Sequence, residues 1–345
     1  MSISLIKMVT IGILPSFLKR FFYRLKGAKI GKNVHFGLFS YINGKEVEIG
    51  DDSKISPFTF INVKRLKVGK RVQVKMMVAI DTGEVEIGDD SVIMEQVTVG
   101  GMLTPRSVLK IGKRVKIFPF SFLNPTEAIT IADDVGVGGS NYIFTHASWL
   151  SVLDGFPVTF GPVSIERRVW LTWRVSILAN VVIGEDSIIG AGSVVNRNIP
   201  KKSLASGSPA KVLISNGKFI REPSFEGKDK ILRKIWHEFK DYEIYQGRKA
   251  YIEETTSDLR IYLKTKSKTL CLLYEKNDTA AEPKSDIYVC LSRISQKKRQ
   301  EMTAGGIAWF DLEKREAVYS NTETWKEVKD FFGRYGIRFS ILEKF

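Results

Sequence analysis

A short motif recurs between residues 30 and 200, and it constrains the fold more than any other feature of the chain. The motif is an aliphatic residue that is usually followed by a glycine and then by two polar or charged residues. Seven copies begin at Ile30, Ile49, Val68, Ile87, Ile111, Ile131 and Ile183. The first four lie 19 residues apart, and within a unit an aliphatic residue recurs every six residues. A period of six fits neither an α-helix nor a simple alternating strand.

The period of six does fit a short strand followed by a turn, repeated many times. Aliphatic side chains then point inward, and glycine, aspartate or asparagine occupies the corners. Three such edges make a triangular coil of about 18 residues, which stacks on the next coil through backbone hydrogen bonds. This pattern resembles the hexapeptide-repeat, left-handed parallel β-helix, so we expect a mainly β fold with that architecture over residues 30–215.

Two interruptions of the repeat predict loops. The copies at Ile87 and Ile111 are 24 residues apart, so about five residues are expected to protrude near 101–105. A further aliphatic at Ile165 stands 34 residues after Ile131, which leaves a loop of about 16 residues, roughly 147–162. Long loops on a repeat fold are usually functional or form oligomers.

The first 29 residues form a separate segment. It mixes apolar and basic residues, and the first acidic residue of the chain is Glu46. Pro15 should divide the segment into a short apolar piece and an amphipathic helix over about 16–27. Such a helix suits an anionic membrane surface, and it equally suits a cap on the next domain. We expect a cytoplasmic protein, peripheral at the inner face of the membrane if the first alternative holds.

The chain changes character after the repeat. Residues 216–228 are predicted to be a linker, and 229–345 a small α/β domain. Helices are expected over 229–245, 295–302 and 324–335, and strands over 259–263, 270–274, 286–291, 306–311 and 338–342. The excess of basic residues gives a net charge of +15, but it is concentrated at the N-terminus and accompanies no nucleic-acid-binding motif.

His146 is the strongest candidate for chemistry. It lies three residues after Ile143, so it misses the inward positions of the repeat, and it opens the longer loop. A neutral imidazole there can take a proton from a sugar hydroxyl, although a plain surface histidine fits the pattern as well. With only three histidines and two cysteines in the chain, we expect neither a disulfide framework nor a three-histidine metal site.

Residues 146–211 resemble the maltose, galactoside and chloramphenicol group of hexapeptide acetyltransferases. The matching stretches are Val169–Trp170, Ile189–Val195 and Gly207–Lys211. The resemblance implies that His146 is the general base and that acetyl-CoA is the donor. It also implies a homotrimer whose sites lie in the grooves between adjacent β-helices, without a metal.

The same resemblance assigns residues to the donor site. Ala191 matches a position that contacts the pantetheine arm, Asn196 and Arg197 match the nucleotide end, and Lys211 matches a basic residue near the adenosine phosphates. Trp173 departs from the family pattern because an indole replaces a small residue beside the cofactor arm. It would stack on the pantetheine or the acceptor, or narrow the tunnel.

Asn124, Trp149 and Trp170 complete the candidate site as substrate-binding residues. We therefore predict an acetyl-CoA-dependent O-acetyltransferase that modifies a saccharide hydroxyl in a surface polysaccharide pathway. An N-acyltransferase acting on a nucleotide-linked amino sugar is an alternative, and so is a β-helix scaffold without enzymatic activity. A nucleic-acid partner is not expected.

Overall fold

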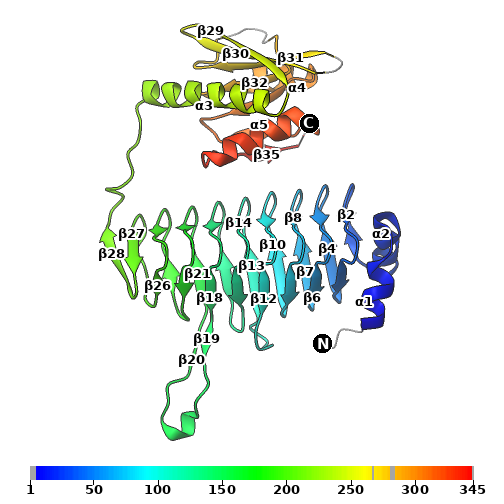
Figure 1. Cartoon of the computed structure of the whole chain (residues 1–345), viewed down its shortest axis with the longest axis vertical. Coiled ribbons are helices and arrows are strands. Elements are labelled where there is room, and N and C mark those ends of the chain that lie inside the picture. Colours follow the sequence, from blue (N-terminus) through cyan, green and yellow to red (C-terminus); the bar gives the residue numbers. More distant parts are fainter. Residues whose placement is uncertain (1–4, 266–267, 280–283, 344–345) are drawn as a thin grey trace. The chain divides into compact units, whose positions relative to one another are not determined.

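A computed structural model describes residues 5–265, 268–279 and 284–343, and it divides the chain into two compact units between Ile220 and Arg221 (Figure 1). The first unit contains the N-terminal helices and the repeat. The second unit contains three helices and one mixed sheet. Each unit has its own hydrophobic core.

Three sheets build the repeat region, because each coil contributes one strand to each sheet. Sheet A consists of β1 (Lys29–Ile30), β4 (Glu46–Ile49), β7 (Arg65–Val68), β10 (Glu84–Ile87), β13 (Val108–Ile111), β16 (Ile129–Ile131), β21 (Val163–Ile165) and β24 (Val182–Ile183). Sheet B consists of β2 (His35–Phe36), β5 (Lys54–Ile55), β8 (Gln73–Val74), β11 (Val92–Ile93), β14 (Lys116–Ile117), β17 (Gly136–Val137), β22 (Trp170–Leu171), β25 (Ile188–Ile189), β27 (Leu204–Gly207) and β28 (Ala210–Ile214). Sheet C consists of β3 (Tyr41–Asn43), β6 (Phe60–Asn62), β9 (Ala79–Asp81), β12 (Thr98–Gly100), β15 (Phe122–Asn124), β18 (Tyr142–Phe144), β23 (Ser176–Ile177) and β26 (Val194–Val195).

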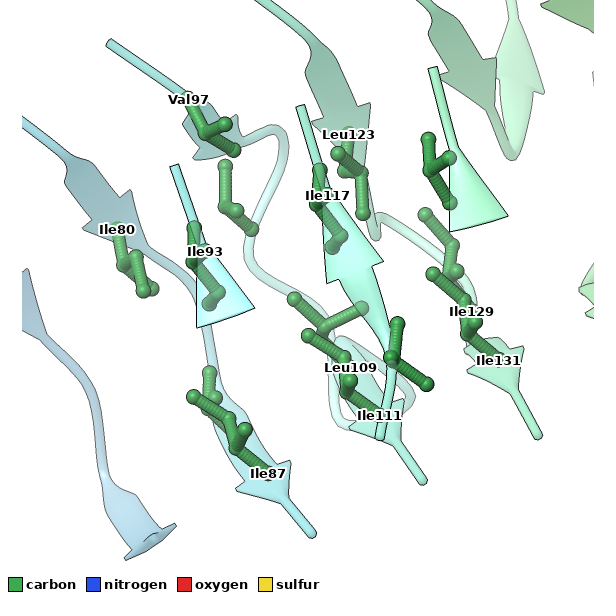
Figure 2. Close-up of a cluster of buried hydrophobic side chains, with 14 of the residues drawn as sticks. Ile80, Ile87, Ile93, Val97, Leu109, Ile111, Ile117, Leu123, Ile129 and Ile131 are labelled. Atoms are coloured by element: carbon green, nitrogen blue, oxygen red, sulfur yellow. The ribbon is translucent and has the colours of Figure 1, made fainter. Parts of the chain in front are cut away.

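The aliphatic residue of each strand points into the prism, and equivalent residues of successive coils pair in parallel register. Ile87 pairs with Ile111, for example, and Ile111 pairs with Ile131. Figure 2 shows these side chains stacked in columns, and those at the centre are almost fully buried. Burial of branched aliphatic side chains is the main source of stability for such a core. The predicted fold class, a left-handed parallel β-helix of hexapeptide repeats, is confirmed.

The corners of the prism differ in one respect from the expected pattern. We name them the AB, BC and CA edges, after the sheets that they join. Asp52 takes the left-handed conformation expected of a corner, but so do Arg71 and Phe58, with φ near +57°. The glycines of the repeat instead stand where the backbones of successive coils approach closely. A Cβ on Gly50 would lie 2.6 Å from the carbonyl carbon of Gly69 in the next coil.

The AB edge carries a ladder of charged pairs that alternate in sign from coil to coil. Asp134 accepts two hydrogen bonds from Arg114, at 2.7 and 2.8 Å. Such bidentate pairs combine charge with fixed geometry. The successive pairs of the ladder are Lys32–Asn33, Asp51–Asp52, Lys70–Arg71, Asp89–Asp90, Lys113–Arg114, Asp133–Asp134, Arg167–Arg168, Glu185–Asp186 and Lys201–Lys202.

Two helices precede the first coil, α1 (Leu5–Gly12) and α2 (Ser16–Leu25), and Pro15 separates them as predicted. The second helix ends at Leu25 rather than near residue 27. The hydroxyl of Tyr23 accepts a hydrogen bond from the Ile42 amide, which anchors α2 on the first coil. The expected cap is therefore present. Among the described residues, no helix is long and apolar enough to cross a membrane.

Both predicted loops leave the prism without disturbing its register. The shorter loop, near 101–107, is tied down by hydrogen bonds from Arg106 to the Glu127 carboxylate at 2.6 and 2.7 Å. The longer loop begins and ends as a small antiparallel ladder, β19 (His146–Ala147) with β20 (Thr159–Phe160), and η1 (Val152–Asp154) lies near its tip. Figure 1 shows this arm projecting away from the three sheets.

In the second unit, the helices pack against a seven-stranded sheet with the order β29-β30-β31-β32-β33-β34-β35. Its strands are β29 (Lys249–Glu254), β30 (Asp258–Lys264), β31 (Thr269–Glu275), β32 (Ile287–Cys290), β33 (Ala308–Asp311), β34 (Glu316–Val318) and β35 (Ser340–Leu342), and its helices are α3 (Phe225–Tyr245), α4 (Gln296–Ala304) and α5 (Glu323–Arg334). Strands β29 and β34 were not predicted from the sequence.

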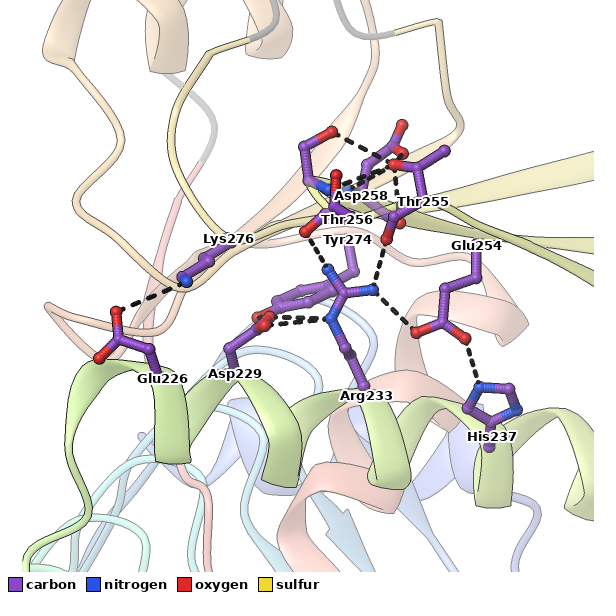
Figure 3. Close-up of polar contacts among 11 residues, drawn as sticks. Glu226, Asp229, Arg233, His237, Glu254, Thr255, Thr256, Asp258, Tyr274 and Lys276 are labelled. Atoms are coloured by element: carbon purple, nitrogen blue, oxygen red, sulfur yellow. Dashed lines mark hydrogen bonds and ion pairs between the residues drawn. The ribbon is translucent and has the colours of Figure 1, made fainter.

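The boundary of the second unit also needs correction. Helix α3 begins at Phe225, so the last four residues of the predicted linker, 225–228, are helical. Ser224 caps the helix by accepting a hydrogen bond from the Gly227 amide. Farther along α3, Arg233 binds Asp229, Glu254 and two backbone carbonyls, which ties the helix to the turn after β29 (Figure 3).

Candidate active site

His146 lies at the root of the arm, immediately after the last strand of its coil. Its ring stacks on Phe160 of the returning strand, with centroids 5.8 Å apart and planes 19° from parallel. Its Nδ1 atom is buried and has no hydrogen-bond partner among the described residues. Nε2 is therefore the nitrogen that remains to meet a reactant. The ring is held in place by the aromatic contact and by the β19–β20 ladder.

The residue before the histidine is fixed by the neighbouring coil. The hydroxyl of Thr145, which is fully buried, donates to the carbonyl of Asn124 at 2.6 Å and accepts from the amide of Glu127 at 2.9 Å. Asn124, predicted to bind the substrate, thus lies on the coil next to that of the histidine. Its side-chain oxygen accepts a hydrogen bond from the hydroxyl of Thr126 at 2.8 Å, so this oxygen is engaged inside the protein.

Three of the predicted donor-site residues gather on the BC edge and the hairpin that follows it. Trp173 packs over Gly139, where a Cβ would lie 2.3 Å from the indole. Ala191 lies one coil farther on, and the next residue's amide donates to the Trp173 carbonyl at 3.0 Å. Lys211 pairs with Ser206 in the β27–β28 hairpin at the end of the same edge. Trp173, Ala191 and Lys211 are all exposed.

The other two donor-site residues, Asn196 and Arg197, lie on the CA edge with His146. They follow β26, two coils beyond the histidine, and both are exposed. Asn180 occupies the intervening coil, where its amide donates to the Phe160 carbonyl at 3.4 Å. Phe160 and Asn180 were not predicted as site residues, although an aromatic residue directly before the Gly161–Pro162 end of the loop was a usable signal.

The candidate residues thus occupy two edges, and sheet C separates them. The first outward position of each sheet C strand forms a column, which we call the sheet C column. From coil to coil its members are Tyr41, Phe60, Ala79, Thr98, Phe122, Tyr142, Ser176 and Val194. None of these side chains is charged. The equivalent column of sheet A carries Glu48, Lys67, Glu86 and Lys110 in its earlier coils, followed by the uncharged Thr130, Ser164 and Val182.

The two other predicted substrate residues lie away from these edges. Trp170 points outward from sheet B beside Gly136 and is half exposed. Trp149 stands in the arm and is 96% exposed. The arm also exposes other large apolar side chains, namely Leu150, Val152, Leu153, Phe156 and Val158. An apolar surface of this kind marks a contact site for another molecule.

Neither Glu166 nor Asp154, the acids of the following coil and of the arm, bonds to the histidine in the part of the chain that the structure describes. The Glu166 carboxylate accepts a hydrogen bond from the amide of Glu185 at 2.9 Å. Asp154 lies in η1, near the tip of the arm. Within the described ranges, no group of three histidine, cysteine, aspartate or glutamate residues is arranged to hold a metal ion.

Comparison with known proteins finds the same repeat. Residues 162–197 match the family model of the hexapeptide repeat of succinyl-transferase. A Schizosaccharomyces pombe relative named "Putative acetyltransferase" is 51% identical over 85 residues, which cover 24% of this chain and 41% of the relative. A Staphylococcus aureus relative with the same description is 51% identical over 53 residues, covering 15% and 27%. The chain thus spans less than half the length of these curated relatives.

Solved structures match in part. One is a Vibrio cholerae hexapeptide-repeat acetyltransferase complexed with acetyl coenzyme A, at 28% identity over 37% of this chain and 69% of that chain, with a TM-score of 0.33. Another is a UDP-N-acetylglucosamine acyltransferase from Bacteroides fragilis, at 20% identity over 54% and 69%, with a TM-score of 0.42. The coils described above and the matched repeat show that the N-terminal unit is a hexapeptide-repeat domain, and part of its sequence is similar to proteins described as acetyltransferases.

Proposed function

We propose that the protein is an acetyl-CoA-dependent O-acetyltransferase that acetylates a saccharide hydroxyl, with His146 as general base. The observation that carries this proposal is the division of the candidate residues between two edges on either side of the sheet C column. A second copy packed against that column brings the CA edge of one chain opposite the BC edge of the other. The reaction site is then the crevice between them.

The uncharged sheet C column supports a homotrimer as the working form. Uncharged and aromatic residues favour burial between subunits, whereas the charged residues of the sheet A column favour solvent. Three prisms, each contributing one CA and one BC edge, close such a ring. In the same arrangement, the exposed apolar side chains of the arm pack on an adjacent subunit.

The tautomer of His146 decides which ring nitrogen can act as the base. For Nε2 to accept a proton, Nδ1 must carry the ring's hydrogen, and a buried N–H needs an acceptor. The described residues of one chain provide none. The proposal therefore rests on Nε2 as the basic nitrogen and assigns no partner residue to Nδ1.

The proposed reaction is a direct acyl transfer. Nε2 of His146 takes the proton of the acceptor hydroxyl as its oxygen attacks the thioester carbonyl. The carbon–sulfur bond then breaks, and the imidazolium returns the proton to the departing thiolate. Acetyl-CoA itself carries the activated acyl group. Lys211 and Arg197 are exposed cations at the places where the donor's phosphates are expected.

The test is a His146→Gln variant of the full-length protein, assayed by release of free CoA thiol from acetyl-CoA in the presence of saccharide acceptors. We expect turnover to fall by about 10²–10⁴-fold, the usual worth of a general base. Binding of CoA, measured by calorimetry, should persist. His237→Gln is the matched control, because His237 lies on α3 and bonds to Glu254. An undiminished rate in His146→Gln would refute the assignment of the base.

The acceptor class is tested in the same assay. Saccharides that offer only hydroxyls are compared with amino sugars and nucleotide-linked amino sugars. Transfer to hydroxyl acceptors is the expected result. Exclusive transfer to amines would make the protein an N-acyltransferase, and absence of both transfer and CoA binding would leave a β-helix scaffold.

A further inference from the structure

The open end of the prism is covered by a helix whose apolar side faces away from the domain. Exposed fractions on α2 are 61% for Phe17, 62% for Phe21 and 72% for Leu25. Helix α1 and its following turn add Val9 and Ile13, each 52% exposed. An ordinary surface helix does the reverse and buries its apolar side. We call the following residues the end face: Val9, Ile13, Phe17, Leu18, Phe21 and Leu25.

Hydrogen bonds fix this orientation. The first coil has no coil before it, so several of its backbone carbonyls lack a strand partner. The basic side chains of α2 meet them instead. Lys19 donates to the Gly37 carbonyl at 2.6 Å, Arg20 to that of Val34 at 2.8 Å and Arg24 to that of Ile30 at 2.7 Å. Rolling α2 to bury the end face would break all three contacts.

Basic residues lie beside the C-terminal end of α2. Lys26, Lys29 and Lys32 follow α2 in sequence and are exposed. Lys26 and Lys45 line a cavity of about 30 Å³ beside the C-terminal end of the helix. The chain has no acidic residue before Glu46. An apolar face with a basic rim complements a membrane surface that contains anionic lipids.

We propose that the end face docks on the surface of an anionic membrane. The phenylalanine and leucine side chains enter the boundary between headgroups and acyl chains, and the lysines of the rim meet the headgroups. The polar side of α2 stays bound to the first coil throughout, so docking needs no unfolding of the cap. This inference does not depend on the acyltransferase proposal. If both hold, the acceptor saccharide is presented at a membrane.

The experiment is flotation of the full-length protein with vesicles of phosphatidylcholine and phosphatidylglycerol, compared with phosphatidylcholine alone. We expect the native protein to float with the anionic vesicles, and the double variant Phe17→Ser/Phe21→Ser to partition at least tenfold more weakly. Lys26→Glu/Lys45→Glu should lose binding to the anionic vesicles in particular. Tyr245→Ser is the matched control, because Tyr245 is an aromatic residue that is 85% exposed at the end of α3.

Several outcomes would overturn the proposal. The proposal is wrong if the native protein floats with neither kind of vesicle, or if the phenylalanine double variant floats as well as the native protein. A change in sedimenting mass of that variant would show instead that the end face joins two copies of the chain. Melting curves followed by circular dichroism check that each variant is folded. If the phenylalanine double variant does not fold, the lysine double variant still tests the proposal.

Discussion

Lys19 has a different role in the structure from the one that its sequence pattern suggested. In sequence it belongs to the basic side of an amphipathic helix, which suggested contact with an anionic surface. In the structure it is fully buried, and its ammonium group donates to the carbonyls of Gly37 and Ser40. Burial lowers the pKa of Lys19 from 10.5 to about 8.

A pH dependence of stability follows from that pKa. In the unfolded chain Lys19 keeps its proton up to about pH 10.5, whereas the folded protein releases it near pH 8. Between these values the unfolded state binds more protons, so rising pH favours the folded state. We expect the melting temperature of the native protein, minus that of Lys19→Met, to increase from pH 7 to pH 9.5. A difference that stays flat or falls would contradict the buried, charged lysine.

His146 was identifiable from the sequence because it breaks the inward register of the repeat and opens a loop. Its surroundings were not. The contact with Phe160 depends on how the two ends of the arm pair, and the bonds of Thr145 depend on the preceding coil. Both are contacts between segments that are distant in sequence, so the repeat motif alone does not predict them.

At the scale of elements, the glycine of the repeat motif is the most restrictive residue of a coil. We expect Gly50→Ala to lower the free energy of unfolding by about 1–3 kcal/mol, the usual cost of overpacking. The added Cβ would lie 2.6 Å from backbone of the next coil. Gly100→Ala is the control, since its Cβ would lie 3.7 Å from the nearest atom outside its chain neighbours. Chemical denaturation measures both, and equal stabilities would contradict the close approach.

The strands of the prism could be predicted because a buried aliphatic residue recurs at a fixed spacing. The missed strands of the second unit lack that signal. Strand β29 is an edge strand of the sheet, and most of its residues are exposed. Its sequence therefore shows little alternation of apolar and polar residues. Strand β34 has three residues, too few to show a period. Helix α3 begins early because Ser224 caps it, although Gly227 made that stretch resemble a linker.

At the scale of the whole molecule, the proposed trimer makes the sheet C column a subunit interface. We expect Phe122→Lys to yield monomers, because a buried, unpaired ammonium group is costly to desolvate. Thr130→Lys places the same charge on the exposed side of sheet A, and we expect it to leave the assembly unchanged. Analytical ultracentrifugation distinguishes the two results. A trimer that tolerates Phe122→Lys, or a native monomer, would remove the basis for a shared crevice.

The charge ladder on the AB edge also limits how a chain of this kind can change in length. Coils with basic pairs alternate with coils carrying acidic pairs, apart from the first, where Asn33 stands beside Lys32. Loss of the single coil from 51 to 69 would bring Lys32 against Lys70, whereas loss of 51–88 would bring it against Asp89. Insertions and deletions of whole coils are therefore expected in even numbers, so the natural unit of duplication in this prism is about 38 residues, twice the 19-residue coil spacing.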